Sequence, residues 1–442
     1  MLNDIINNLR SNNATSVSFF LFCCTIVVLL LIRDVVGISV SKWVFIVLAT
    51  GVYLLYDIEY IAIFTCFLIP FIVGLPNSYI FIIGLIVVLL RNINKLLIKK
   101  DFWILWAIFI VELLSFIYGN FYIYDFIRFA APISLISILI FDNRNTLNSR
   151  NMLLYFLFAA IVAQISVILQ SISINGLDAL ISGGVRLGNT VQLLEIEGMR
   201  ISYNPNGMAL LSGITISILL ILFNIQKQAK VVIAFLIILE IFVGSLSLSR
   251  AFLLLFCVIT IVYIFSLNRG IKRFLEGLIM ATIISVGVYL LVSYFAPSLL
   301  DSYSSRLAVE DLSAGRISIA SEYFEALMDH PERLVLGSGL QNYQVKYGVS
   351  QSSHNGTQEV LITWGIIGLG LVLLYIISIY RHGWRGVASS DRKIIFILPL
   401  IILLVAIQSG QFFSSSVNPM YLLPSYAAMR LAVYTDTRAT FA

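Results

Sequence analysis

The sequence predicts an all-α, polytopic membrane protein with about 12–14 transmembrane helices. The chain of 442 residues is 60% apolar and only 12% charged, whereas a soluble globular domain carries roughly 25% charged residues. Its mean hydropathy is +0.97. Apolar runs of about 20 residues recur from one end to the other, and they are continuous rather than alternating, which indicates helices and not the strands of a membrane barrel.

Fourteen apolar runs are candidate spans when the chain is divided at charges, proline and glycine. The third and fourth are divided only at Leu75-Pro76-Asn77, and the last is rich in serine and proline. The first lacks a small-x-small cleavage site, so we expect an uncleaved span. Residues 1–442 show no internal repeat and are expected to form one transmembrane domain. The runs cover 17–32, 40–56, 59–74, 77–90, 102–117, 122–141, 152–170, 206–224, 231–247, 251–266, 275–295, 357–380, 393–409 and 416–434.

The distribution of lysine and arginine orients these spans. If the basic loop 91–100 is cytoplasmic, alternation of the spans places most of the 28 basic residues and both termini in the cytoplasm. Two long loops, 171–205 and 296–355, then lie on the outer side. They hold most of the basic residues that run against the positive-inside rule, so we expect something other than orientation to require them. The outer basic residues are Arg33, Arg186, Arg200, Arg250, Arg306, Arg316, Arg333 and Lys346.

Several classes of function are disfavoured by composition. The net charge of +5 is small and sits mostly in short loops, which is an orientation signal and not a nucleic-acid surface. The four cysteines lie within apolar runs without ligand spacing, and the three histidines are scattered without the Asp/Glu spacing of a metal site. No phosphate-binding loop or dinucleotide fingerprint is present. The sequence therefore predicts no metal, no cofactor and no nucleic-acid partner.

The loop 296–355 is the longest polar segment of the chain. Arg316 heads an amphipathic stretch that reaches Met328 and is expected to form a short helix on the membrane face. An arginine fork suits a pyrophosphate, although a solvated arginine at a helix start is the simpler interpretation. His354 lies at the outer surface, and its ordinary pKa of about 6.5 makes it the obvious proton acceptor there. Glu359, about one turn later, could orient His354 or act as a second carboxylate.

Further candidates lie outside this loop. Arg200 precedes the sequence Tyr203-Asn204-Pro205-Asn206-Gly207, in which either asparagine could cap a helix that begins at the proline. That pattern is a helix start and, with the arginine, a potential seat for phosphate. Arg250 ends a tight outer hairpin, where it could extend to the lipid headgroups or bind an anion. Arg186 is a weaker candidate for the same role.

The order of these motifs resembles the O-antigen ligase and polymerase superfamily over roughly residues 180–375. Members of that family are bacterial inner-membrane glycosyltransferases with an all-helical, GT-C-like architecture. They transfer glycans from undecaprenyl pyrophosphate at the periplasmic face without a metal. The motifs that carry the resemblance are Arg200…Asn204-Pro205-Asn206, Ser249-Arg250, Gly315-Arg316, His330-Pro331…Leu336-Gly337-Ser338-Gly339, and His354-Asn355…Leu361…Gly365-Ile366-Ile367-Gly368.

The resemblance implies roles for particular residues. The phosphate-contacting arginines would be Arg200, Arg250 and Arg316, and the loop histidine would be His354. Arg186 and Arg333 are left open as further contacts, and supporting roles fall to Tyr203, Asn204, Asn206 and Glu359.

The implied function is polymerisation of O-antigen or a related surface polysaccharide. The alternative is a ligase, which uses the same donor chemistry with lipid A-core as acceptor. A flippase for lipid-linked sugars is less expected, because few charges (Glu112, Arg128 and Glu240) fall in the middle of spans. Expected partners are an undecaprenyl-pyrophosphate-linked glycan, membrane lipids and a chain-length regulator protein.

Overall fold

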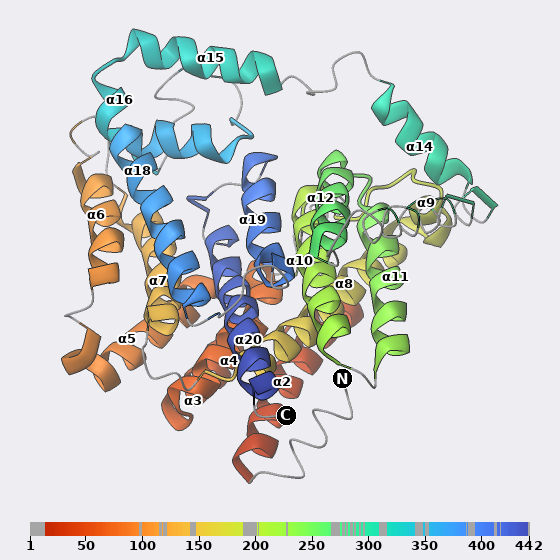
Figure 1. Cartoon of the computed structure of the whole chain (residues 1–442), viewed down its shortest axis with the longest axis horizontal. Coiled ribbons are helices and arrows are strands. Elements are labelled where there is room, and N and C mark those ends of the chain that lie inside the picture. The colour runs from red at the N-terminus through yellow and green to blue at the C-terminus, as the bar shows by residue number, and fades with distance from the viewer. Residues whose placement is uncertain are drawn as a thin grey trace.

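The computed structural model describes a bundle of helices, and every element among the described residues is helical. In Figure 1 most long helices run between the upper and lower ends of the view, while α15 (Arg316–Asp329) lies across the upper end. The predicted all-helical fold is therefore confirmed for the described residues. The described residues are all except 1–13, 97–99, 115–116, 118–121, 142–146, 189–200, 202, 227–228, 267–274, 276–278, 280–281, 283–285, 287–288, 291–292, 295–296, 309–315, 341–347, 350–352, 386, 388–393, 411–412, 416 and 441–442.

Five helical stretches are long and apolar enough to cross a membrane. They are Thr15–Val36, which combines α2 (Ala14–Leu31) and η1 (Ile32–Val36), and the helices α7 (Ile123–Phe141), α8 (Ser149–Asn175), α10 (Pro205–Ile225) and α18 (Gly356–Trp384). The number of spans stays a prediction. The other helices at predicted spans are α3 (Lys42–Leu55), α4 (Ile58–Leu68), η2 (Ile69–Gly74), α5 (Asn77–Leu96), α6 (Lys100–Leu114), α11 (Lys230–Leu246), α12 (Arg250–Ser266), η5 (Ile394–Ile397), α19 (Leu398–Gln408), η6 (Asn418–Tyr421) and α20 (Leu422–Thr440).

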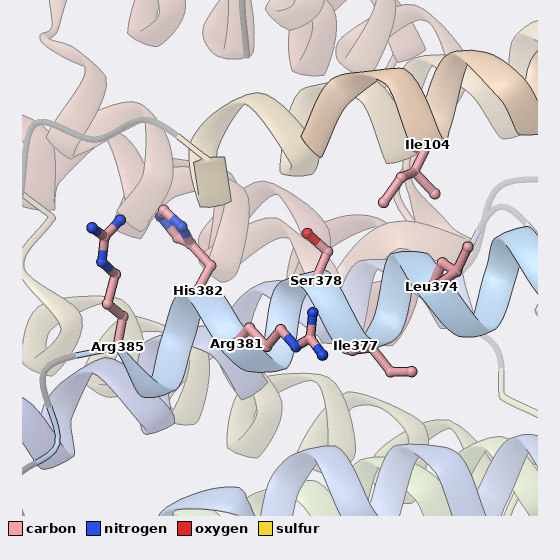
Figure 2. Close-up of a pocket in the computed structure, with 7 residues that line it drawn as sticks. All are labelled: Ile104, Leu374, Ile377, Ser378, Arg381, His382 and Arg385. Carbon is pink, nitrogen blue, oxygen red and sulfur yellow. The ribbon is translucent and has the colours of Figure 1, made fainter. Parts of the chain in front are cut away.

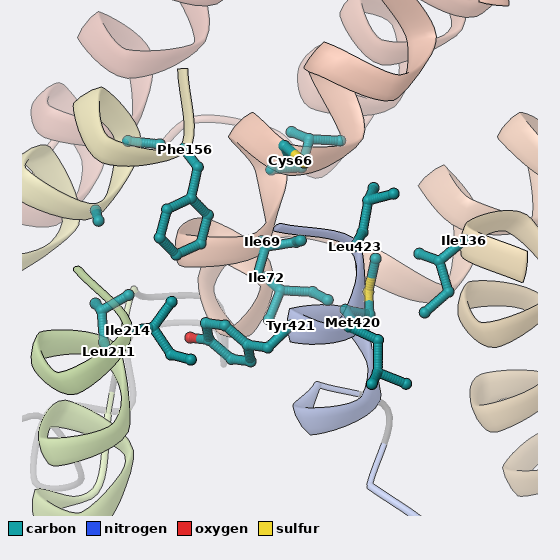
Figure 3. Packing of buried hydrophobic residues seen from close by; sticks show 14 of the residues in the cluster. Cys66, Ile69, Ile72, Ile136, Phe156, Leu211, Ile214, Met420, Tyr421 and Leu423 are labelled. Carbon is teal, nitrogen blue, oxygen red and sulfur yellow. The ribbon is translucent and has the colours of Figure 1, made fainter. Parts of the chain in front are cut away.

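The core of the bundle is built around α10, which contacts α8, α11, α12, α19 and α20. Gly213 lets Leu255 and Ile402 approach this helix closely, because an added methyl group would lie 3.3 and 3.1 Å from them. Beside α10, Tyr421 of η6 packs near Phe156 of α8 and the residues of η2 (Figure 3). The predicted helix start at Asn-Pro-Asn-Gly is confirmed, with the Asn204 side chain accepting a hydrogen bond from Gly207 N at 2.6 Å.

The two predicted outer loops contain helix. In 171–205, α8 continues to Asn175 before α9 (Leu177–Ile181) begins, so the predicted loop boundary is a few residues too early. The continuation is favoured because Ser171 is buried and its carbonyl accepts a hydrogen bond from the Asn175 side chain at 3.3 Å. In 296–355, the described residues form α14 (Pro297–Leu307), α15 and α16 (Arg333–Leu336). The helix expected to begin at Arg316 is α15.

The predicted span 357–380 is broken at Gly365, where α18 has φ 66° and ψ −168°. The first part of α18 lies across the bundle before the helix turns downward (Figure 1). The break is held by backbone contacts, since Ser338 N donates to Ile362 O at 2.9 Å and Gly339 N donates to Thr363 O at 2.8 Å. Glu112 of α6 joins the two segments at the break, because it accepts hydrogen bonds from Trp364 Nε1 at 2.7 Å and Leu340 N at 3.2 Å.

Substitution of Gly365 by alanine is expected to lower the free energy of unfolding by about 1–3 kcal/mol. A side-chain carbon would lie 2.2 Å from the carbonyl oxygen of Val335 on a backbone that only glycine adopts readily. Thermal unfolding in detergent measures the effect. Gly370→Ala is the matched control, because that glycine is within the helix and nothing lies within 4 Å of an added carbon. Equal melting temperatures for the two variants would contradict the role given to the break.

Candidate functional site

Polar side chains from two distant segments, Asn206 and Arg316, meet at Gly410, just after α19. A side-chain carbon added at Gly410 would lie 3.4 Å from Arg316 Nη2 and 3.4 Å from Asn206 Nδ2. Arg316 Nη1 also donates a hydrogen bond to Ser409 O at 2.9 Å. The N-terminal turns of α10 and α15 are therefore both joined to the C-terminal end of α19.

Arg250 belongs to the same cluster. It begins α12, and the preceding residue, Ser249, donates from Oγ to Asn206 Oδ1 at 2.7 Å while its Oγ accepts from Ala251 N at 3.2 Å. Ser249 thus caps α12 and ties it to the start of α10. Partial burial, and additionally the charge of Arg250, lower the pKa of Arg316. Two like charges are held near each other here, an arrangement that favours binding of an anion.

His354 completes the cluster at the start of α18. Burial, and additionally the charge of Arg316, lower the pKa of His354 below its usual value, so the imidazole is neutral at neutral pH and able to accept a proton. Its backbone lies in the left-handed region with φ 49°, which is uncommon for a residue other than glycine and occurs preferentially at functional sites. The next residue, Asn355, caps α18 by accepting from Gln358 N at 3.0 Å.

Side chains at the start of α18 attach it to its neighbours. Gln358 Nε2 donates to Ala320 O of α15 at 2.9 Å, and Thr357 Oγ1 donates to Gln408 Oε1 of α19 at 2.6 Å. These two contacts hold α15, α18 and α19 together directly beside His354. They explain how residues almost a hundred positions apart in the sequence, such as Arg316 and Ser409, are kept in contact.

Glu359, expected near His354, is completely buried. Its Oε1 accepts a hydrogen bond from the hydroxyl of Ser414, in the segment that joins α19 to η6. Its second oxygen, Oε2, is buried without a hydrogen-bond partner among the described residues. Glu359 thus binds Ser414 after α19, and its influence on His354 stays a prediction.

The structure places three of the other predicted residues, Arg186, Tyr203 and Arg333. Arg186 Nε donates to Ser247 O at 3.2 Å, which places it on the hairpin that carries Arg250. Tyr203 is buried and donates its hydroxyl to Pro70 O, so its role is to anchor the start of α10. Arg333 lies beyond the far end of α15, about 20 Å along that helix from Arg316. It is therefore not part of the cluster. Arg200 lies outside the described residues.

Sequence reasoning missed the contribution of the segment that follows α19. Gln408, Ser409, Gly410 and Ser414 all contact the cluster or the start of α18. The signal was present as the polar residues Gln408, Ser409, Gln411, Ser414 and Ser415, at and between the adjoining ends of the last two apolar runs. Among the described residues, no group of three or more His, Cys, Asp and Glu side chains could hold a metal ion.

A buried ion pair supports the chain next to Arg200. Arg33 donates from Nε and Nη2 to the Asp34 carboxylate at 2.5 and 3.0 Å, and its guanidinium lies 5.2 Å from the centre of the Phe45 ring. Asp34 Oδ2 also accepts from Ile201 N at 3.1 Å. The pair therefore holds the residue that follows Arg200 against the end of the first span.

Asp34→Ala is expected to destabilise the protein by about 3–5 kcal/mol, because it leaves the buried Arg33 guanidinium without its carboxylate. Thermal unfolding in detergent checks this expectation. Asp57→Ala is a suitable control, since Asp57 is exposed and makes no side-chain cap to the helix it precedes. Loss of stability to the same extent in both variants would show that the ion pair is not responsible.

Comparison with known proteins found no protein-family model and no curated protein that matches this chain. Its function is therefore inferred from the geometry around Gly410 and from the resemblance in the order of its motifs.

Proposed function

We propose that this chain is a metal-independent, inverting glycosyltransferase that polymerises O-antigen or a related surface polysaccharide. It would transfer the growing glycan from undecaprenyl pyrophosphate onto the next lipid-linked repeat unit, at the periplasmic face of a bacterial inner membrane, in a GT-C-like helical bundle with cytoplasmic termini. The observation that carries the proposal is that Arg316 lies close enough to both Arg250 and His354 for their charges to act on one another, and that His354 has a lowered pKa.

The two arginines suit the leaving group of this reaction. As the bond between the anomeric carbon and the phosphate oxygen breaks, the electron pair and its negative charge pass to the pyrophosphate. Cations that are already in place stabilise this charge more strongly in the transition state than in the ground state. Arg316 is held by Ser409 O, and Arg250 begins a helix capped by Ser249, so both are anchored at one end. Arg186, which contacts the hairpin that carries Arg250, and Arg200 are the candidates for further contacts with the pyrophosphate.

His354 suits the role of general base. A sugar hydroxyl of the acceptor attacks the anomeric carbon of the donor from the side opposite the pyrophosphate, and its proton passes to the neutral imidazole. A new glycosidic bond forms as the bond to phosphate breaks, so the anomeric configuration inverts. Positioned proton transfer of this kind contributes about 10²–10⁴-fold to a rate.

The decisive experiment supplies the purified protein with a defined lipid-linked repeat unit and analyses the product. We expect a ladder of polymers with inverted configuration at each new linkage. A ligase would instead form product only when lipid A-core is added. In cells, a polymerase deletion leaves cores capped with single repeats, whereas a ligase deletion leaves bare cores and accumulated lipid-linked glycan. Absence of any new glycosidic bond under all these conditions would refute the proposal.

A lipid-linked sugar transporter is the alternative class. Buried carboxylates and broken helices are typical of transporters, and Glu112, Glu240 and the break at Gly365 have that character. Both carboxylates, however, accept hydrogen bonds that join helices, Glu112 from Trp364 and Glu240 from Gln164 at 2.8 Å. These contacts give both residues a structural role. Glu240→Gln, which can keep the contact with Gln164, should therefore leave polymer formation intact.

A further inference from the structure

A second site lies at the other end of α18 from His354. It is a cavity of about 280 Å³ between α6 and α18. From the break at Gly365 to the end of α18, the helix is about 28 Å long at 1.5 Å per residue, close to the thickness of the hydrocarbon core of a bilayer. The cavity is therefore expected at the opposite membrane face from the Gly410 cluster. Its lining residues are Ile104, Leu374, Ile377, Ser378, Arg381, His382 and Arg385.

The cavity has an apolar half and a cationic half. Figure 2 shows Ile104 of α6 facing Leu374 at one end of the cavity, with Arg381, His382 and Arg385 following along α18. Leu374 and Ile377 are 52% and 42% exposed, so the apolar half is open to the surroundings of the bundle. Five of the lining residues belong to α18, and Arg385 is the residue that directly follows the helix. They recur every three or four residues along the chain and therefore fall on one side of the helix.

The cationic half carries two arginines at the end of α18. Arg381 and Arg385 are exposed and four residues apart, and among the described residues neither forms an ion pair. Like charges at this spacing on a helix repel each other. A third arginine, Arg430, donates to Arg385 O at 2.9 Å, which adds further positive charge. His382 stacks on Tyr426, with ring centres 5.9 Å apart, and this contact holds its side chain at the cationic end of the cavity.

We propose that this cavity binds one anionic phospholipid. The lipid phosphate lies between Arg381 and Arg385, and an acyl chain lies along Ile104, Leu374 and Ile377. Basic pockets between membrane helices are suited to such headgroups. Orientation of the protein would explain arginines at the end of α18, but not a hollow that joins them to an exposed aliphatic surface. A free phosphate would use the arginines and leave that aliphatic surface without a function. The proposal does not depend on the glycosyltransferase activity.

The test measures lipid retention by native mass spectrometry of the detergent-purified protein. Dioleoyl phosphatidylglycerol is the anionic probe, dioleoyl phosphatidylethanolamine is the zwitterionic probe, and inorganic phosphate is the competitor. We expect the anionic lipid to be retained in preference to the zwitterionic one and not to be displaced by phosphate at the same concentration. In Arg381→Gln/Arg385→Gln, apparent affinity for the anionic lipid should fall about 10- to 30-fold.

Two variants control for charge and folding. Lys227→Gln/Lys230→Gln removes the same charge on the same predicted side and should retain the lipid as the unaltered protein does, while Arg381→Lys/Arg385→Lys keeps the charge and should retain most of it. If the double glutamine variant is not monodisperse, the single variants Arg381→Gln and Arg385→Gln replace it, each with a smaller expected loss. Equal retention of both lipids, displacement by phosphate, or an equal loss in the Lys227/Lys230 variant would each overturn the proposal.

Discussion

Replacing His354 or Arg250 with alanine is expected to abolish glycan transfer at unchanged protein level. Loss of the general base should cost about 10²–10⁴-fold in rate. Removal of one cation that faces the leaving phosphate should cost about 10²–10³-fold, as for other pre-placed groups that stabilise developing negative charge. The measurement is the rate of polymer formation by purified variants, with saturating lipid-linked repeat so that the chemical step is followed.

Arg128→Ala is the control for removal of an arginine. Arg128 is exposed on α7, where it lies over the Tyr124 ring at 5.6 Å, and no contact joins it to the Gly410 cluster among the described residues. Its rate should stay close to that of the unaltered protein. Transfer retained by both His354→Ala and Arg250→Ala would end the assignment of roles, even if the protein proved to be a glycosyltransferase.

The charge of Arg316 is expected to change the pH dependence of transfer, because it lowers the pKa of His354. The base must be unprotonated, so the rate falls as the pH drops through the pKa of His354. Burial and the charge of Arg316 lower that pKa, which places the acid limb of the unaltered enzyme below the usual value for histidine. Removing the charge with Arg316→Gln should raise the pKa of His354 and move the acid limb to higher pH. Single-turnover rates across the pH range, each normalised to its own plateau, measure the shift.

Arg316→Lys separates this electrostatic effect from the loss of a phosphate contact. The lysine keeps the positive charge but not the planar fork that donates to Ser409 O. Its plateau rate should therefore fall, while its acid limb stays near that of the unaltered enzyme. If the acid limbs of Arg316→Gln and the unaltered protein coincide, either His354 is not the titrating base or Arg316 does not act on it.

Local features of the cluster could be predicted from sequence because they depend on neighbouring residues. Asn204 was recognisable as a cap from its position before Pro205 and Gly207, and α15 from the amphipathic pattern that follows Arg316. Arg250 and His354 were recognisable as a cation and a base on the predicted outer side of the membrane. Their mutual arrangement was not predictable, because Asn206, Ser249, Arg316 and Ser409 are brought together by contacts between helices that are far apart in the chain.

The break in α18 could not be predicted from the sequence either. Hydropathy indicates one span across 357–380, since Gly365 and Gly368 alone do not end an apolar helix in a membrane. The helix breaks because the backbone of 335–339 docks against Thr363 and Gly365, and Glu112 from α6 holds both partners. A pattern within α18 cannot contain that information. The Asp34 contact with Ile201 is hidden for the same reason.

The sequence by itself determined that this protein is an all-helical membrane protein, where most of its helices begin, and which polar residues have no place in lipid. These properties follow from the cost of burying polar and backbone groups in a bilayer, which every segment meets separately. Only the tertiary structure decided that Arg250, Arg316 and His354 share one location, that Arg333 lies elsewhere, and that Arg381 and Arg385 border a cavity with an aliphatic side. Those outcomes depend on how whole helices pack against one another, and packing is a property of pairs of segments rather than of any single one.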